Sequence, residues 1–176
     1  MEYWDVYDIN GNKLGYAKRA DEEFFMGEYR LGASLWIADS SGKLLIQKRA
    51  PSKKTGPNLW SITGGKVQSG ESSTEACLRE VREEIGLALS ENSIQFLYRS
   101  IGSGMLFDDY IAIIDFPASQ ATLSSSEVSA IKWTTLDDIQ YLYAEGEFLY
   151  NNISDLSKVN DYLNKRLIHI KGNDRL

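Results

Sequence analysis

The chain has 176 residues, of which 43% are hydrophobic and 25% are charged, values typical of a single globular domain. It contains one cysteine and one histidine, which excludes an internal disulfide and a cysteine/histidine zinc site and disfavours a histidine-based catalytic triad. The net charge of −6 argues against general nucleic-acid binding, which needs a basic surface.

The first third of the chain predicts short strands separated by turns. Asn10-Gly11 is a strong hairpin signal between two alternating segments, and a loop with two prolines is expected at residues 50–58. Gly64-Gly65 ends the last extended segment of this region. Strands are expected at residues 2–7, 13–17, 31–38, 44–48 and 60–63.

A helix is expected from Ser72 or Ser73 to Ile85. Ser72 lies three residues before Glu75, as in a capping box, and Gly86 lies where a helix C-terminal cap belongs. Strands and helices then follow without regular alternation, which predicts an α+β fold with a mixed sheet flanked by helices. The expected strands are residues 94–100, 110–116 and 128–134, and the expected helices are 136–143 and 154–168.

The expected organisation is one domain over residues 1–176, with a hairpin extension at 1–27 and a C-terminal helix at 154–168. The apolar stripe of that last helix fits packing on its own domain or packing across a homodimer. Apolar runs such as residues 111–114 are too short to span a bilayer, and residues 1–8 do not resemble a signal peptide. We therefore expect a cytoplasmic protein without a membrane segment.

Three glutamates share one face of the helix expected around residues 73–85. Glu80, Glu83 and Glu84 project within an arc of about 100° because residues three and four positions apart are neighbours on a helix. Such like charges near a helix C-terminus repel one another and oppose the helix dipole. A hard divalent cation that prefers oxygen ligands, magnesium or manganese, would relieve both effects.

The segment around these glutamates resembles the Nudix signature. That signature is Gly, five residues, Glu, seven residues, Arg-Glu, an aliphatic residue, any residue, Glu-Glu, any residue, Gly and an aliphatic residue. Every specified position is filled at the right spacing, by Gly65, Glu71, Arg79, Glu80, Val81, Glu83, Glu84, Gly86 and Leu87.

The resemblance implies a Nudix-type α/β/α sandwich and Mg²⁺-dependent hydrolysis of a diphosphate linkage, with Mn²⁺ as a substitute cation. The small-molecule substrate would be a nucleoside diphosphate derivative or a related organic diphosphate. By the same resemblance, Glu80, Glu83 and Glu84 are metal ligands and catalytic residues, with the Gly65 carbonyl as a further ligand. Arg79 would orient this cluster together with Glu71. Glu127, just before the strand at 128–134, would be a further ligand or the general base.

Several other side chains are candidates for substrate contacts. Arg30, Arg49 and Lys54, together with Lys48 and Lys53, could contact phosphate groups, although each could equally be a surface charge. Aromatic side chains could hold the organic group, and Trp60 is the first candidate. The others are Trp36, Phe107 and Tyr110, of which Trp36 is expected in the core.

Two alternative functions remain open from the sequence. A second resemblance, to the subgroup related to isopentenyl-diphosphate isomerase, covers the segment from Glu2 to Asp8, Asn10-Gly11 and the spacing of Arg49, Lys53, Pro57 and Trp60. The isomerase cysteine and histidines are missing, because Thr63-Gly64-Gly65-Lys66 stands where that enzyme has its Cys-Ser-His stretch. The other alternative is a Nudix-like ligand-binding module without turnover, although such modules usually lose signature glutamates.

Overall fold

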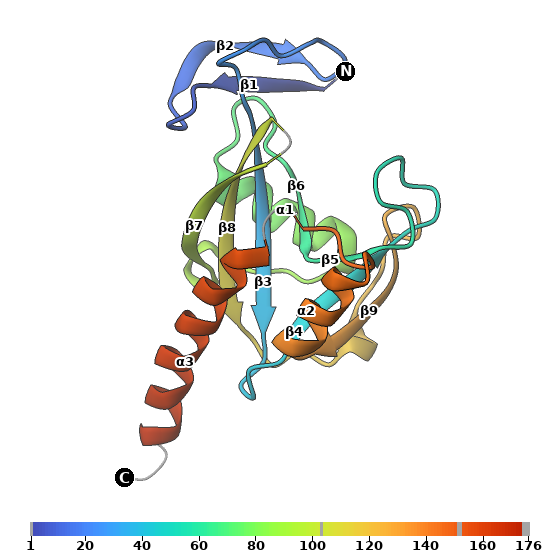
Figure 1. Cartoon of the computed structure of the whole chain (residues 1–176), viewed down its shortest axis with the longest axis vertical. Coiled ribbons are helices and arrows are strands. Elements are labelled where there is room, and N and C mark those ends of the chain that lie inside the picture. Colours follow the sequence, from blue (N-terminus) through green and yellow to red (C-terminus); the bar gives the residue numbers. More distant parts are fainter. Residues whose placement is uncertain (1, 103, 151–152, 174–176) are drawn as a thin grey trace.

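The computed structural model describes residues 2–102, 104–150 and 153–173, with side chains in the last range as far as residue 167. Figure 1 shows a central sheet with helices on both sides and a separate hairpin at one end. The strands are β1 (Tyr3–Tyr7), β2 (Lys13–Arg19), β3 (Arg30–Ala38), β4 (Leu44–Arg49), β5 (Trp60–Ser61), β6 (Thr63–Lys66), β7 (Gln95–Gly102), β8 (Met105–Ile113) and β9 (Val128–Thr134). The helices are α1 (Ser73–Ile85), α2 (Leu136–Ala144) and α3 (Leu156–Asn173), with short 3₁₀ turns at Glu91–Ser93, Ala118–Gln120 and Ile153–Asp155.

The central sheet is mixed and seven-stranded. Its strand order is β5-β4-β3-β8-β7, with β6 also paired to β3 and β9 also paired to β4. The pairing of β3 with β8 is parallel, and the other pairs are antiparallel. β1 and β2 form their own two-stranded sheet. The predicted Nudix-type sandwich with an N-terminal hairpin is therefore confirmed.

Alternation along β3 divides the core into two halves. Leu35 and Ile37 pack in one buried cluster with α1 residues, whereas Trp36 packs in a second cluster with residues of α2 and α3. Successive side chains of a strand point to opposite faces, so one apolar strand supplies both clusters. In Figure 1, α1 accordingly lies behind the sheet, and α2 and α3 lie in front of it.

The start and end of α1 are set by local interactions. The Ser72 side chain accepts a hydrogen bond from the Glu75 backbone N–H at 3.1 Å, and the Glu75 carboxylate accepts one from the Ser72 backbone N–H at 2.8 Å. Gly86 ends the helix with a φ of 74°, a conformation that glycine adopts without steric cost. The predicted capping box and C-terminal cap are confirmed, and together they hold the register of the glutamates on α1.

β8 differs from its prediction. A strand is present as expected, but its predicted bounds of 110–116 were wrong, because β8 begins five residues earlier, at Met105, and ends at Ile113. Asp108 and Asp109 interrupt the apolar pattern, yet both are buried within the strand. Asp108 is accommodated there by an ion pair with Arg99 on β7, with Nε and Oδ1 2.6 Å apart.

The C-terminal helix packs on its own domain in its first half. Leu156, Val159 and Leu163 are buried in the second cluster, and the helix runs to Asn173, beyond the predicted end at residue 168. Homodimerisation remains a prediction. The helices among the described residues fall short of the length and apolarity that a bilayer span requires.

Candidate active site

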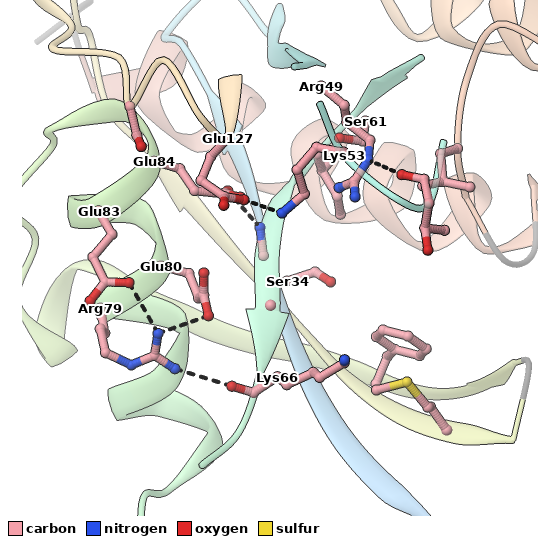
Figure 2. A pocket seen from close by; sticks show the side chains of 18 of the residues that line it. Ser34, Arg49, Lys53, Ser61, Lys66, Arg79, Glu80, Glu83, Glu84 and Glu127 are labelled. Atoms are coloured by element: carbon pink, nitrogen blue, oxygen red, sulfur yellow. Dashed lines mark hydrogen bonds and ion pairs between the residues drawn. The ribbon is translucent and has the colours of Figure 1, made fainter. Parts of the chain in front are cut away.

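A cavity of about 1260 Å³ opens between α1 and the loops that follow β4 and precede β9. Figure 2 shows its two sides, with Arg79, Glu80 and Glu83 on α1 and Arg49 and Lys53 across from them. We call Glu80, Glu83 and Glu84 the carboxylate face, and Arg49, Lys53 and Lys54 the basic wall. The cavity thus brings together an acidic surface and a basic one.

Arg79 organises the acidic side of the cavity. Its Nε donates to Glu71 Oε1 at 2.8 Å, and its Nη1 donates to Glu80 Oε1 at 2.8 Å and to Glu83 Oε2 at 3.3 Å. Its Nη2 also donates to the Lys66 carbonyl at 3.1 Å, which ties α1 to β6. The hydrogen bond from Arg79 lowers the pKa of Glu71. Arg79 therefore stays charged and holds two of the three carboxylates in place.

The three carboxylates differ in burial. Glu84 is 4% exposed, whereas the Glu83 side chain is 59% exposed and Glu80 lies between them. Glu84 Oε2 accepts hydrogen bonds from Gln47 Nε2 at 2.8 Å and from the Gly64 backbone N–H at 3.3 Å. Burial raises the pKa of Glu84 to about 7 and also raises the pKa of Glu80. Two of these carboxylates are therefore costly to keep ionised without a cation.

Two glycines allow β6 to approach these groups. A Cβ added at Gly65 would lie 2.2 Å from Glu80 Oε1, so Glu80 rests directly against the Gly65 backbone. A Cβ added at Gly64 would lie 2.5 Å from the Ala33 carbonyl oxygen. No side chain larger than hydrogen fits at either position without rearrangement.

The donor atoms on the acidic side fit a hard cation by their chemistry. Carboxylate and backbone carbonyl oxygens are the ligands that Mg²⁺ prefers, and the glycine at position 65 leaves its backbone open beside Glu80. Within the described residues, no group of three or more His, Cys, Asp or Glu side chains is yet arranged to hold a metal. The reason is visible in the contacts: Glu80 and Glu83 turn toward Arg79, while Glu84 turns toward Gln47.

The basic wall faces the same cavity. Lys53 forms an ion pair with Glu127, and Arg49 Nε donates to the Thr55 carbonyl at 2.9 Å, which holds the loop after β4. Lys54 and Glu127 also line the cavity. The fold therefore gathers four predicted site residues, Arg49, Lys53, Lys54 and Glu127, in the cavity that the carboxylate face also lines.

Two predicted substrate contacts are placed elsewhere. The Arg30 guanidinium lies over the rings of Trp4 and Phe24, 4.8 and 4.3 Å from their centroids. Trp60 carries the ammonium group of Lys132 over its ring at 4.4 Å. Neither Arg30 nor Trp60 lines the cavity, and their roles in substrate binding remain predictions.

The single cysteine is also away from the cavity. Cys77 is buried in the cluster between α1 and the sheet, and burial raises the pKa of its thiol to about 12. A thiol with so high a pKa is a poor nucleophile at neutral pH. Cys77 therefore packs the helix, as its position in the helical pattern suggests.

The sequence did not predict the residues that β3, β6 and β8 contribute to the floor of the cavity. Ser34 on β3, Lys66 on β6 and Asp109 on β8 line it, along with Phe107, which the sequence had suggested only as an aromatic candidate. The available signal was a pair of acidic residues, Asp108 and Asp109, inside an otherwise apolar stretch. Its meaning depends on the pairing of β8 with β3, which is not a local property of the sequence.

Comparisons with known proteins agree with this geometry. Residues 28–154 match the family model of the NUDIX domain. The chain is 35% identical over 153 residues to an uncharacterized Nudix hydrolase of Listeria monocytogenes, covering 85% of this chain and 89% of that protein. It is 28% identical to an isopentenyl-diphosphate Delta-isomerase of Cutibacterium acnes over 147 residues, 76% of this chain and 74% of the isomerase. A crystal structure of a protein from Deinococcus radiodurans superposes with a TM-score of 0.72 at 24% identity, covering 91% of this chain and 98% of that one, which shows a shared fold.

Proposed function

The chain belongs to the Nudix family of hydrolases, which act on diphosphate-type substrates, and from this premise we propose that it catalyses Mg²⁺-dependent hydrolysis of a diphosphate linkage. The substrate would be a nucleoside diphosphate derivative or a related organic diphosphate. The observation that carries the proposal is the cavity in which the carboxylate face lies opposite the basic wall. A diphosphate is anionic, so its binding needs cationic groups and a means of neutralising phosphoryl charge.

Glu80, Glu83, Glu84 and the Gly65 carbonyl would hold the divalent cation, with Mn²⁺ as a substitute. When bound, such a cation supplies charge neutralisation at phosphoryl oxygens and acidifies a water molecule. Arg79 acts as a positioning residue, because its hydrogen bonds to Glu80 and Glu83 hold these carboxylates beside β6. Its bond to Glu71 keeps Arg79 itself in place.

The basic wall would bind the substrate. Arg49, Lys53 and Lys54 present cationic groups to phosphate oxygens, for which charge-assisted hydrogen bonds are about twice as strong as neutral ones. Glu127 would take the proton from the attacking water as general base. Its ion pair with Lys53 keeps it at the cavity wall, and a phosphate group that attracts Lys53 would release the Glu127 carboxylate for this role.

The isomerase alternative is favoured by the likeness to isopentenyl-diphosphate isomerases. Two observations count against it. Gly64 and Gly65 line the cavity in the segment where that enzyme carries its cysteine, and Cys77 is buried in the core. An isomerase would convert isopentenyl diphosphate to its allylic isomer without releasing phosphate.

The proposal is tested by measuring cleavage of the diphosphate linkage with Mg²⁺ in nucleotide sugars, dinucleotides, nucleoside triphosphates and prenyl diphosphates, with the phosphate ester, pyrophosphate or phosphate products separated by chromatography. With the best substrate, Glu83→Gln and Glu84→Gln should each lower kcat by about a hundredfold or more. Glu91→Gln is the matched control, because Glu91 is exposed in a 3₁₀ turn outside the cavity.

Wild-type rates in both Glu83→Gln and Glu84→Gln would refute the assigned role of the carboxylate face. Tight binding of a panel compound without turnover would instead favour a binding module. Allylic product without phosphate would favour the isomerase.

A further inference from the structure

A row of residues crosses the sheet at the floor of the cavity. Ser34 on β3 pairs with Gly64 on β6 and with Asp109 on β8 in the same register. Neighbouring strands lie about 4.8 Å apart, so Asp109 is roughly 10 Å from Gly64 across the sheet. The Gly64 backbone N–H donates to Glu84, so the row leads from the carboxylate face to Asp109.

Asp109 is a buried acid with weak partners. It is 1% exposed, and it accepts hydrogen bonds from Ser100 Oγ at 3.3 Å and from the Tyr150 hydroxyl at 3.5 Å, both long. Among the described residues it has no ion pair, in contrast to Asp108, which is paired with Arg99. Burial raises the pKa of Asp109 to about 7, so its neutral form is well populated at neutral pH.

Ser34 supplies a second polar group beside it. The part of the chain that the structure describes gives the Ser34 hydroxyl no hydrogen bond, and Figure 2 shows this side chain at the cavity. A Cβ at Gly64 would lie 3.0 Å from Ser34 Oγ, so the glycine leaves the hydroxyl uncovered. Ser34 therefore retains hydrogen-bonding capacity on the row between Gly64 and Asp109.

These two groups favour an uncharged polar ligand. A phosphate would meet an acid at Asp109, which among the described residues has only two long hydrogen bonds and no ion pair to offset further negative charge. An ammonium group would need Asp109 ionised, which burial opposes. A hydroxyl group can both donate to and accept from a neutral carboxyl and a serine, and Phe107 and Met105 can cover the attached carbon atoms.

We propose that Asp109 and Ser34 form a specificity subsite that binds a hydroxyl group on the organic part of the diphosphate substrate. The inference rests on the proposed function, because the carboxylate face and the basic wall must hold the diphosphate at the other end of the row. It names the substrate class as organic diphosphates whose organic part is hydroxylated. Without such a hydroxyl, buried polar groups would lose their water and gain no partner, which is the basis of strong discrimination.

The test uses two non-hydrolysable probes, the glycerol and propyl monoesters of methylenediphosphonate, which differ only in two hydroxyl groups. Dissociation constants are measured by calorimetry on the full chain with Mg²⁺. The wild type should bind the glycerol ester at least about tenfold more tightly than the propyl ester. Asp109→Leu should reduce this preference to within about twofold, and Asp109→Asn should keep most of it, because an amide still donates and accepts hydrogen bonds.

Ser34→Ala is a second variant that removes only a hydroxyl, and it should reduce the preference several-fold even if Asp109→Leu does not fold. Asp108→Asn is the matched control, because it changes the neighbouring acid, whose side chain lies on the opposite face, and should keep the preference. Equal binding of both probes to the wild type, or equal weakening of both by Ser34→Ala and Asp109→Leu, would overturn the inference. The outcome does not depend on turnover, so failure of the proposed function shows separately as absence of cleavage products from the substrate panel.

Discussion

Replacement of Asp109 by Asn should make the stability of the protein less dependent on pH. Asp109 is almost fully buried, and its pKa is raised from an ordinary value of 3.8 to about 7, first because of burial and also because Asp155 and Asp108 are nearby acids. The folded state therefore holds this proton more tightly than the unfolded state does. The stabilisation from the bound proton is fully present below pH 3.8 and is lost as the pH rises through about 7.

The magnitude follows from the two pKa values. At 1.36 kcal/mol per pH unit, the difference between 3.8 and about 7 corresponds to about 4 kcal/mol, of which about 3 kcal/mol falls between pH 5 and pH 8. The side chain introduced by Asp109→Asn does not titrate, so the free energy of unfolding of this variant should not fall by this amount between pH 5 and pH 8. Ser100 and Tyr150, which contact Asp109, remain in both proteins.

The assay is urea unfolding of the wild type and of Asp109→Asn at pH 5 and pH 8. The free energy of unfolding of the variant, relative to the wild type, should rise by about 3 kcal/mol between these pH values. Because other titrating groups, Glu84 among them, are common to both proteins, the comparison isolates Asp109. A relative stability that is the same at pH 5 and pH 8 would refute the buried, proton-holding state of Asp109.

Three further predictions address the cation, the helix and the basic wall. Mg²⁺ at about a hundred times its Kd should add about 2.7 kcal/mol to the free energy of unfolding, which raises the Tm by about 5–10 °C. Glu83→Gln should remove most of this rise in Tm. An equal rise in the variant would contradict the role of Glu83 as a ligand. Ser72→Ala breaks the capping box with Glu75 and should cost about 1 kcal/mol, measured by urea unfolding, where an unchanged midpoint would show that the box is dispensable. Lys53→Ala should raise KM for the best diphosphate substrate about tenfold in steady-state assays. Lys132→Ala is the control and should leave KM unchanged, because Lys132 lies over Trp60 outside the cavity. Equal KM values for the two variants would argue against a phosphate contact by Lys53.

Features set by neighbours in the sequence were predicted well. The capping box of Ser72 and Glu75, the C-terminal cap at Gly86 and the shared face of the glutamates all depend on spacings of three or four residues along one helix. The contact between Arg79 and Glu71 spans only about two helical turns and the short segment before α1. Such features follow from helix geometry and are independent of the rest of the fold.

The start of β8 was misjudged for the opposite reason. Asp108 and Asp109 are unfavourable in a strand by local preference, and their burial is made acceptable by partners on β7, at Arg99 and Ser100. These partners come together only through the pairing of two strands. The same pairing, with β3 on the other side, creates the row that joins Asp109 to Ser34 and Gly64.

The sequence by itself therefore determined the helix that carries the glutamates, through local spacing, and it indicated the family and the sandwich fold through the resemblance to the Nudix signature. Only the tertiary structure decided which cations share a cavity with that helix. Arg30 and Arg49 both end or begin a strand, yet Arg30 stacks on Trp4 and Phe24 while Arg49 lines the cavity. The surroundings of a side chain depend on which distant strands and loops pack beside it, and the cost or gain of that packing is not contained in any short stretch of sequence.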